Sequence, residues 1–276
     1  MPVKVNGQFE RSEGTQKRTL FNVNNIRMCS LKYKFIYIDQ KPRLFKSSGL
    51  AFGSAVHSAV EWFNKRRMQN EETSIDQLLD IFEADWTSLN CDQISDKNGD
   101  NQESLFLTVQ SLLRLYYDKT NGEKVIAVEY PFEVPLINDK TGETLDLPLV
   151  GIFDLVESGP TIADLKTAGR KMIYEDVDIH LQITAYSYAY WMKNNKLPDL
   201  RLDVLLKYKT NPKFEPMPTT RTHKDHRVFF NIAKQVICEI QNQVFFPNPG
   251  WLCSDCEYRQ ECWVFNGKYN FKGGDN

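Results

Sequence analysis

GIFDLVESGPTIADLKT, residues 151–167, contains two apolar runs on either side of Gly159 and Pro160. Glycine and proline between apolar runs indicate a tight turn, so we expect two adjacent antiparallel strands. Asp154 lies in the first of these strands and Asp164 in the second. The stretch therefore predicts a β-hairpin that brings two carboxylates to one edge of a sheet.

The charged side chains of this hairpin are suited to a divalent cation. Side chains two positions apart in a strand share a face, so Asp164 and Lys166 point the same way while Leu165 points to the core. One or two Mg²⁺ or Mn²⁺ ions on Asp154 and Asp164 could neutralise a phosphodiester, and the ammonium of Lys166 could serve an attacking water. Taken alone, however, an Asp-x-Lys triplet is more typical of an exposed ion pair.

Length and composition limit the class of protein. A chain of 276 residues with 41% hydrophobic residues can bury a large core. No apolar run approaches the roughly 18 to 20 residues of a membrane helix, and residues 1–20 lack the apolar core of a signal peptide. We therefore expect a cytoplasmic protein with no membrane partner. The formal net charge of −2 counts against a generic basic nucleic-acid binder but leaves local patches open.

Apolar periodicity predicts helices and strands along most of the chain. The expected helices are residues 50–68, 75–89, 103–119, 178–195 and 224–244, and the expected strands are 124–136, 144–156, 161–167 and 202–208. Residues 90–102 are expected to form a loop, and residues 21–39 a short helix that runs into a strand-like segment. This order predicts an α/β fold with a mixed sheet. No Gly-x-Gly-x-x-Gly or Walker loop indicates a nucleotide site.

Cysteines gather near the C-terminus. Cys253, Cys256 and Cys262 fall within ten residues, and Cys29 lies alone near the N-terminus. Disulfides are rare in a reducing compartment, so metal ligation is the leading hypothesis for the group of three. Cys238 lies beside apolar residues of the last long helix and is expected in the core.

The hairpin resembles the catalytic motif of the PD-(D/E)xK nuclease superfamily. That motif consists of Gly-x-x-Asp, a turn, and an apolar strand ending in Asp-x-Lys, as found at Gly151, Asp154, Asp164 and Lys166. Phe153 stands where relatives often have a proline, a departure that the RecB-like exonuclease branch tolerates. The chain resembles this branch most, which includes the AddB nuclease domain and the CRISPR-adaptation exonucleases.

Two expected helices carry further motifs of the same branch. Gly53 and His57 match its Gly-x-x-x-His helix, in which the histidine is a metal ligand. Gln182 and Tyr186 match its Gln-x-x-x-Tyr motif, and the i, i+4 spacing places both side chains on one helix face. Taken alone, His57 is more typical of a histidine that flanks the core.

The resemblance implies one metal site and one catalytic set. The implied metal ligands are His57, Asp154, Asp164, the backbone carbonyl of Leu165 and, as an addition, Glu129. Glu133, on the same polar face of the strand, could equally take the place of Glu129. The implied catalytic set is Asp154, Asp164, Lys166, Gln182 and Tyr186, with Mg²⁺ or Mn²⁺ as cofactor.

The cysteine spacing resembles the iron–sulfur staple of AddB-type and CRISPR-type members. Four thiolates, from Cys29, Cys253, Cys256 and Cys262, would bind a [4Fe–4S] cluster and clamp the N-terminal arm to the C-terminal tail. A structural Zn²⁺ is the chemical alternative, because four cysteines also suit tetrahedral zinc.

The resemblance also implies the architecture, a restriction-endonuclease-like mixed sheet flanked by helices. Residues 1–120 would form an N-terminal arm and a helical lobe, residues 121–245 the nuclease core, and residues 246–276 an iron–sulfur cysteine tail packed against the arm. The implied function is a metal-dependent DNA exonuclease that prefers single strands. It would act in recombination, repair, phage replication or CRISPR adaptation, with a helicase or CRISPR-adaptation protein as partner. The alternative is a non-catalytic DNA-end-binding subunit of a larger nuclease–helicase complex.

DNA contacts would be mostly to phosphate, with low sequence specificity. Basic residues near the motifs are candidates for lining a groove: Lys32, Lys34, Arg170, Lys171, Lys207 and Lys209. Tyr174, Tyr186 and Tyr190 are candidates for stacking on splayed bases, with core packing as the alternative.

Overall fold

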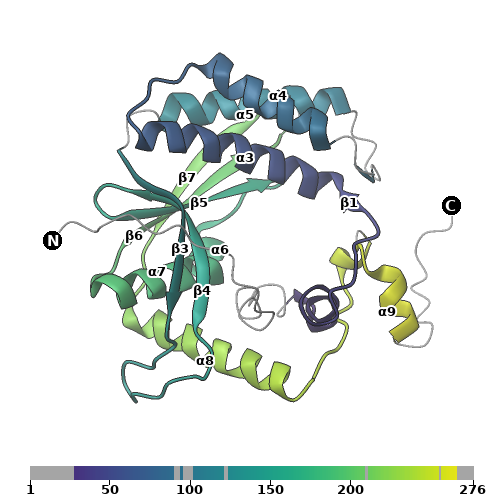
Figure 1. Ribbon diagram of the computed structural model, residues 1–276, viewed down its shortest axis with the longest axis vertical. Helices are drawn as coiled ribbons and strands as arrows, with labels where there is room; N and C mark the ends of the chain where they lie inside the picture. Colours follow the sequence, from purple (N-terminus) through teal and green to yellow (C-terminus); the bar gives the residue numbers. More distant parts are fainter. Residues whose placement is uncertain are drawn as a thin grey trace.

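A five-stranded mixed sheet forms the centre of the computed structural model, which describes residues 28–89, 94–95, 102–120, 124–208, 211–254 and 256–265. The strands, in their order across the sheet, are β3 (Val125–Val134), β4 (Leu149–Glu157), β5 (Thr161–Ala168), β6 (Asp199–Leu206) and β7 (Lys213–Thr219). Neighbouring strands are antiparallel, except that β5 and β6 are parallel. The hairpin predicted from residues 151–167 is the β4–β5 pair (Figure 1).

Helices cover both faces of this sheet (Figure 1). One face carries α3 (Ser48–Met68), α4 (Ile75–Leu89) and α5 (Gln102–Thr120), and the other carries α6 (Tyr174–Asp178), α7 (Leu181–Asn194) and α8 (His223–Gln241). The remaining elements are short: α2 (Ser30–Tyr33), the π-helical turn η1 (Lys34–Ile38), β1 (Lys46–Ser47), β2 (Ile94–Ser95), η2 (Trp251–Cys253) and α9 (Arg259–Phe265). This is the restriction-endonuclease-like α/β architecture that the sequence predicts.

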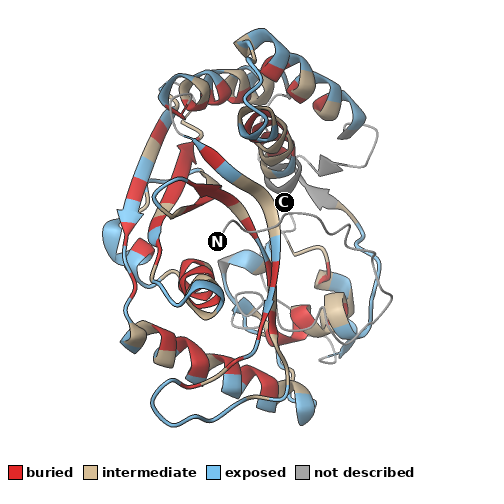
Figure 2. Cartoon of the chain, turned by 60° about the vertical axis from the view of Figure 1, so that its left-hand side comes forward, coloured by how far each residue is buried: buried red, intermediate tan, exposed pale blue. Residues whose placement is uncertain are grey.

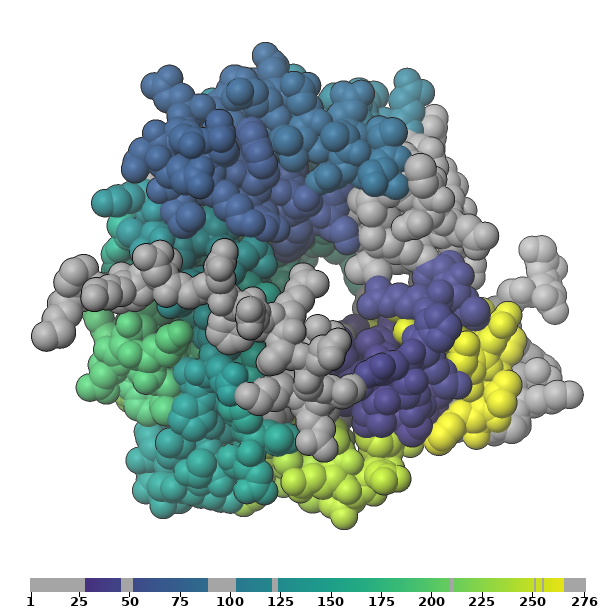
Figure 3. Space-filling model, viewed as in Figure 1, coloured from purple at the N-terminus to yellow at the C-terminus, as the bar shows by residue number. Residues whose placement is uncertain are grey.

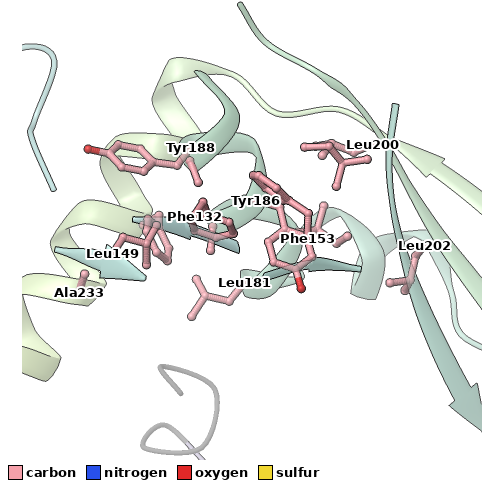
Figure 4. Packing of buried hydrophobic residues seen from close by; sticks show 14 of the residues in the cluster. Phe132, Leu149, Phe153, Leu181, Tyr186, Tyr188, Leu200, Leu202 and Ala233 are labelled. Carbon is pink, nitrogen blue, oxygen red and sulfur yellow. The ribbon is translucent and has the colours of Figure 1, made fainter. Parts of the chain in front are cut away.

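Each face of the sheet has its own apolar core, because successive strand residues point to opposite sides. Leu205 on β6 packs with α3, α4 and α5, whereas Leu202 on the same strand packs with α7 and α8. Figure 2 shows the buried residues gathered on the sheet and on the inner sides of the helices. Figure 4 shows the second core, where Tyr186 and Tyr188 of α7 lie near Phe153.

The predicted helices of the first lobe are confirmed. Those expected at residues 50–68, 75–89 and 103–119 are α3, α4 and α5. The start of α4 has the capping box that its sequence indicates. Ser74 Oγ accepts a hydrogen bond from the backbone N–H of Gln77 at 3.2 Å, and Gln77 Oε1 accepts one from the N–H of Ser74 at 3.0 Å.

Two details of the second half of the chain differ from the prediction. The helix expected at 178–195 is α7, which begins only at Leu181 because His180 has extended backbone angles, and the short helix α6 before it was not predicted. Strand β7 was not predicted at all, since it contains Pro216 and Pro218. Proline cannot donate to a sheet ladder, but an edge strand such as β7 tolerates it.

Further corrections concern short segments. Residues 34–38 form a π-helical turn and not a strand-like segment. Within the expected loop 90–102, Ile94–Ser95 forms β2 and pairs in parallel with β1. Cys238 is exposed on α8 and not in the core. Cys91 and Lys209 lie outside the described residues.

The described N-terminal segment lies against the C-terminal segment, although more than 200 residues separate them in sequence (Figure 3). Ser30 Oγ donates to the carbonyl of Phe246 at 3.1 Å and accepts from its N–H at 2.9 Å. Lys32 pairs with Glu257 at 2.8 Å. Across the described ranges, no helix has the length and apolar character needed to cross a membrane.

Candidate active site

Asp154 and Asp164 lie where β4 and β5 separate. The ladder between the two strands ends with Leu155 opposite Ala163, so the next position in register places the two aspartates opposite each other. Asp164 is completely buried and Asp154 partly buried. The two carboxylates therefore lie opposite each other, as the sequence predicts. The point at Asp154 and Asp164 where β4 and β5 separate is called the strand fork.

A continuous chain of polar contacts joins the two aspartates through α7. Lys166 Nζ lies 2.8 Å from Asp164 Oδ2 and donates a hydrogen bond to Gln182 Oε1 at 2.9 Å. The amide nitrogen of Gln182 lies 2.9 Å from Asp164 Oδ1 and 2.8 Å from the Tyr186 hydroxyl. Tyr186 in turn donates to Asp154 Oδ1 at 3.1 Å. All five residues of the predicted catalytic set thus lie in one hydrogen-bonded group.

Burial controls the charge state of this group. It raises the pKa of Asp164; the Lys166 ammonium acts in the opposite direction, and the Asp154 carboxylate adds to the rise. Burial also raises the pKa of Tyr186 far above its ordinary value, so the phenol remains a donor. The ring of Tyr186 packs edge-on against Phe153 and Phe132, with centroids 5.3 and 6.1 Å away.

His57 reaches the strand fork from the opposite face of the sheet. Helix α3 lies close to β5 at Gly53, where a Cβ would be 3.4 Å from Thr167 Oγ1. The His57 ring and Leu165 line the same cavity. Burial lowers the pKa of His57, although the Asp154 carboxylate opposes that shift. The neutral imidazole is the form that binds metal ions.

Glu129 lies opposite Asp154 on β3. The flanking pairs, Val128 with Leu155 and Tyr130 with Phe153, place it there in register. Its φ of 48° is in the left-handed region, which is unusual for a residue with a side chain and marks local strain. Glu129 and His57 line the same small cavity.

Glu129 is favoured over Glu133, because Glu133 is exposed and pairs with Val150, beyond the strand fork. Burial, together with the carboxylates of Asp154 and Glu61, raises the pKa of Glu129 to about 7. A negatively charged carboxylate is therefore disfavoured at this position unless positive charge is nearby.

The donor set fits a divalent cation in its chemistry. Several oxygen donors and one imidazole converge on the strand fork, and a cation would relieve the mutual repulsion that raises the pKa of Glu129. Among the described residues, no three His, Cys, Asp or Glu side chains lie close enough together to hold a metal ion as they stand. Protein donors contact the aspartates instead, including the Leu165 N–H at 3.3 Å from Asp154 Oδ2.

The four predicted cluster ligands line one pocket between the terminal segments. Cys29, Cys253, Cys256 and Cys262 all border this cavity of about 240 Å³. Leu31, Phe35 and Tyr258 pack beside it as a small buried cluster. Burial raises the pKa of Cys256, and the neighbouring Cys29 contributes to the rise. Four thiols in one pocket fit a cluster or zinc in donor type, but the sulfurs are not gathered as a preformed metal group.

The candidate DNA contacts differ in availability. Lys32 and Lys34 are engaged in ion pairs with Glu257 and Asp39, respectively. Arg170 and Lys171 are exposed just after β5. Lys207 lies over the ring of Phe52, 4.9 Å from its centroid.

The three candidate tyrosines also differ. Tyr174 is 57% exposed and could stack on a base. Tyr186 is buried in the hydrogen-bonded group, so base stacking is excluded for it in this arrangement. Tyr190 is partly buried at the edge of the core.

Sequence reasoning missed three polar residues near the site, two of them buried and the third, Arg201, partly buried. Asn64, Asp203 and Arg201 lie on α3 and β6, and the first two line the same cavity as His57. The available signal was the pattern Leu-Arg-Leu-Asp-Val, in which charged residues interrupt an otherwise apolar strand.

The chain belongs to the PD-(D/E)XK nuclease superfamily, whose sequence model matches residues 21–263. Its fold is similar to that of a crystal structure described as a "Putative exonuclease" from Eubacterium rectale. That comparison has a TM-score of 0.56 and 13% identity, and it covers 98% of this chain and 97% of the other. A solved structure of SSO0001 gives a TM-score of 0.38 and 11% identity over 84% of this chain and 94% of the other, too low to carry an argument. No curated protein matches significantly.

Proposed function

We propose that this protein is a metal-dependent DNA exonuclease that hydrolyses phosphodiester bonds and prefers single strands. The observation that carries the proposal is the hydrogen-bonded group in which Gln182 contacts both Lys166 and Asp164. An exposed ion pair would need none of this arrangement. Membership of the superfamily and a fold similar to that of the structure described as a "Putative exonuclease" support the same reading.

Each residue of the group has a role that follows from its contacts. Asp154, Asp164, the Leu165 carbonyl, His57 and Glu129 would hold Mg²⁺ or Mn²⁺. When bound, the cation supplies charge neutralisation for the phosphate and lowers the pKa of a water. Lys166, oriented by Gln182, would position the attacking water and offset the negative charge of the phosphate through its ammonium group. Tyr186 fixes the carboxylate of Asp154 through its hydroxyl.

The cysteine pocket supports a second, structural cofactor. Cys29, Cys253, Cys256 and Cys262 would bind a [4Fe–4S] cluster that joins the terminal segments, with zinc as the chemical alternative. The contact between Ser30 and Phe246 already brings those segments together. A cluster there would stabilise the fold without taking part in hydrolysis, because the pocket shares no lining residue with the cavity at the strand fork.

The proposed pathways are recombination, repair, phage replication or CRISPR adaptation. A helicase or a CRISPR-adaptation protein would supply the unwound strand. DNA binding through the phosphates would make cleavage largely independent of sequence.

End-labelled linear and closed circular DNA, single- and double-stranded, would test the proposed activity. The purified protein is incubated with each substrate and Mn²⁺, with EDTA as control. We expect degradation of linear single strands, slower degradation of linear duplex, and intact circles. Cleavage of circular DNA at the same rate as linear DNA would show that the protein is an endonuclease and not an exonuclease. No metal-dependent cleavage of any substrate, with retained DNA-end binding, would favour the non-catalytic DNA-end-binding subunit.

A further inference from the structure

An ion triad with two buried carboxylates and a partly buried guanidinium spans three strands beside the candidate active site. Arg201 on β6 donates two hydrogen bonds to Asp203, from Nε to Oδ1 at 2.7 Å and from Nη2 to Oδ2 at 3.0 Å. Its third nitrogen, Nη1, lies 2.8 Å from Glu157 Oε2 at the end of β4. The carboxylates of Asp203 and Glu157 are only 1% and 2% exposed. Arg201, Asp203 and Glu157 together form the arginine clamp.

The arginine clamp crosses the strand that carries Asp164 and Lys166. Strand β5 lies between β4 and β6, and Arg201 is in register with Ala163 of β5. The small side chain of Ala163 leaves room for the guanidinium to reach β4. Ala163 is also where the last recorded pairing between β4 and β5 ends. The clamp therefore ties β4 to β6 at the closed end of the strand fork.

The clamp is continuous with the candidate metal site. Asp203 is in register with Leu165, and it lines the same cavity as His57 and Asp154. This cavity has a volume of about 20 Å³, which is room for about one water molecule. Burial raises the pKa of Tyr116 on the cavity wall, and the nearby Asp203 carboxylate adds to the rise. The charge of Asp203 therefore acts on a residue that lines the cavity.

Stability alone is a poor explanation for the clamp. Burying the carboxylates of Asp203 and Glu157 and most of the Arg201 side chain costs desolvation free energy, and replacing a buried ion triad by well-packed hydrophobic residues is often neutral or stabilising. A bidentate guanidinium–carboxylate pair does, however, fix geometry closely. Some groups orient metal ligands through hydrogen bonds without binding the metal themselves. Their replacement commonly lowers metal affinity about 10- to 100-fold.

We propose that Arg201 is a positioning residue, which through Asp203 and Glu157 limits how far β4 can separate from β6 and so sets the affinity of Asp154, Asp164 and His57 for a divalent cation. This inference rests on the proposed function, because it concerns the same metal site. Arg201, Asp203 and Glu157 lie outside the sequence motifs of the superfamily. They would raise the affinity for the cation without contacting either the cation or the DNA.

The test measures binding of Mn²⁺ alone to the full chain, by the electron paramagnetic resonance signal of the free ion. The principal variant is neutral at all three positions, Glu157→Gln with Arg201→Gln and Asp203→Asn. We expect the Mn²⁺ dissociation constant to rise about 10- to 100-fold, and thermal melting of the same preparation shows whether the variant is folded. Arg201→Lys keeps the charge but cannot hold both carboxylates, so we expect an intermediate value.

Arg227→Gln is the matched control. It removes an exposed arginine that pairs with Asp139 at 2.9 Å, away from the strand fork, and should leave Mn²⁺ binding unchanged. Should the neutral variant fail to fold, Arg201→Lys decides alone, and wild-type affinity in that variant would overturn the inference. Wild-type affinity in a folded neutral variant would overturn it as well, while leaving the proposed function intact. A wild-type protein that neither binds Mn²⁺ nor cleaves DNA would overturn both.

Discussion

Lys166 Nζ lies 2.9 Å from Gln182 Oε1, so an amide from helix α7 holds the ammonium group of strand β5. The same amide contacts Asp164 through its nitrogen at 2.9 Å. One side chain thus fixes the relative position of a carboxylate and an ammonium. A lysine has several freely rotating bonds, and without this contact its ammonium would sample many positions.

Replacing Gln182 by alanine should therefore reduce catalysis more than binding. We expect kcat to fall about 10- to 100-fold, with a KM change of less than about threefold, because the lysine loses its orientation while DNA contacts remain. Steady-state kinetics on a labelled single strand measures both constants. Gln235→Ala, on the exposed side of α8, is the control and should behave as wild type. Equal losses in both variants would rule out the orienting role.

Two buried tyrosines on α7 offer a matched comparison. Tyr186 donates to Asp154, whereas Tyr188 donates to the backbone carbonyl of Pro135 at 2.9 Å. Removal of either hydroxyl should cost about 1 kcal/mol of the free energy of unfolding. Tyr186→Phe should in addition lower nuclease activity about tenfold, and Tyr188→Phe should not. Denaturant titration and nuclease assays of both variants distinguish a catalytic role from a structural one. Similar activity in the two variants would argue against a catalytic role for the Tyr186 hydroxyl.

Acidification should destabilise the protein through His226. This residue is 2% exposed, its ring contacts Ser187 Oγ at 2.9 Å, and burial lowers its pKa to about 4. Between pH 6.5 and pH 4 the unfolded chain binds a proton at this position that the folded chain does not, so stability falls by at most about 1.4 kcal/mol per pH unit. Above pH 6.5 both states are neutral and the contribution is constant.

The measurement for His226 is the melting temperature from pH 7.5 to pH 4.5. His226→Gln should lose less stability on acidification than the wild type. Part of the pH dependence should remain, because burial lowers the pKa of His180 to about 4 as well. An unchanged slope in the variant would show that His226 is protonated in the folded protein.

The cysteine pocket predicts a coloured protein whose cluster is structural. Anaerobically purified protein should absorb broadly near 400 nm, an estimate from iron–sulfur chemistry. Cys256→Ala should lower the melting temperature and abolish the colour while changing the rate of hydrolysis little, because the pocket is separate from the strand fork. Cys238→Ala, at an exposed position, is the control. Stoichiometric zinc in a colourless protein would contradict the iron assignment.

The central hairpin could be predicted from sequence because its signals are local. Alternation of apolar residues and a Gly-Pro turn suffice to place Asp154 and Asp164 on neighbouring strands. Strand β7 could not be predicted, since Pro216 and Pro218 argue against a strand unless its edge position is known. The division of α6 from α7 depends on tertiary contacts, including the hydrogen bond from Arg221 to the carbonyl of Val177 at 2.7 Å.

The candidate site shows the same limit. Gln182 and Tyr186 were predicted from their resemblance to the Gln-x-x-x-Tyr motif of the RecB-like branch, and the fold brings them into contact with Lys166 and Asp154. The arginine clamp was not recognised, because its members are distant in sequence and meet only across β5. The exposed position of Cys238 could not be predicted either, because apolar neighbours in the sequence do not show which face of the helix packs against the rest of the protein.

The most direct test of the central claim compares wild-type protein with Lys166→Ala in two measurements on the same preparation. Single-turnover cleavage of an end-labelled single strand with Mn²⁺ should fall by about 10³-fold or more, because the water loses its positioning group. Binding of Mn²⁺ should stay within about threefold of the wild type, since lysine is not a metal ligand. Equal cleavage by the two proteins would contradict the assignment of Lys166 and, with it, the catalytic role of the strand fork.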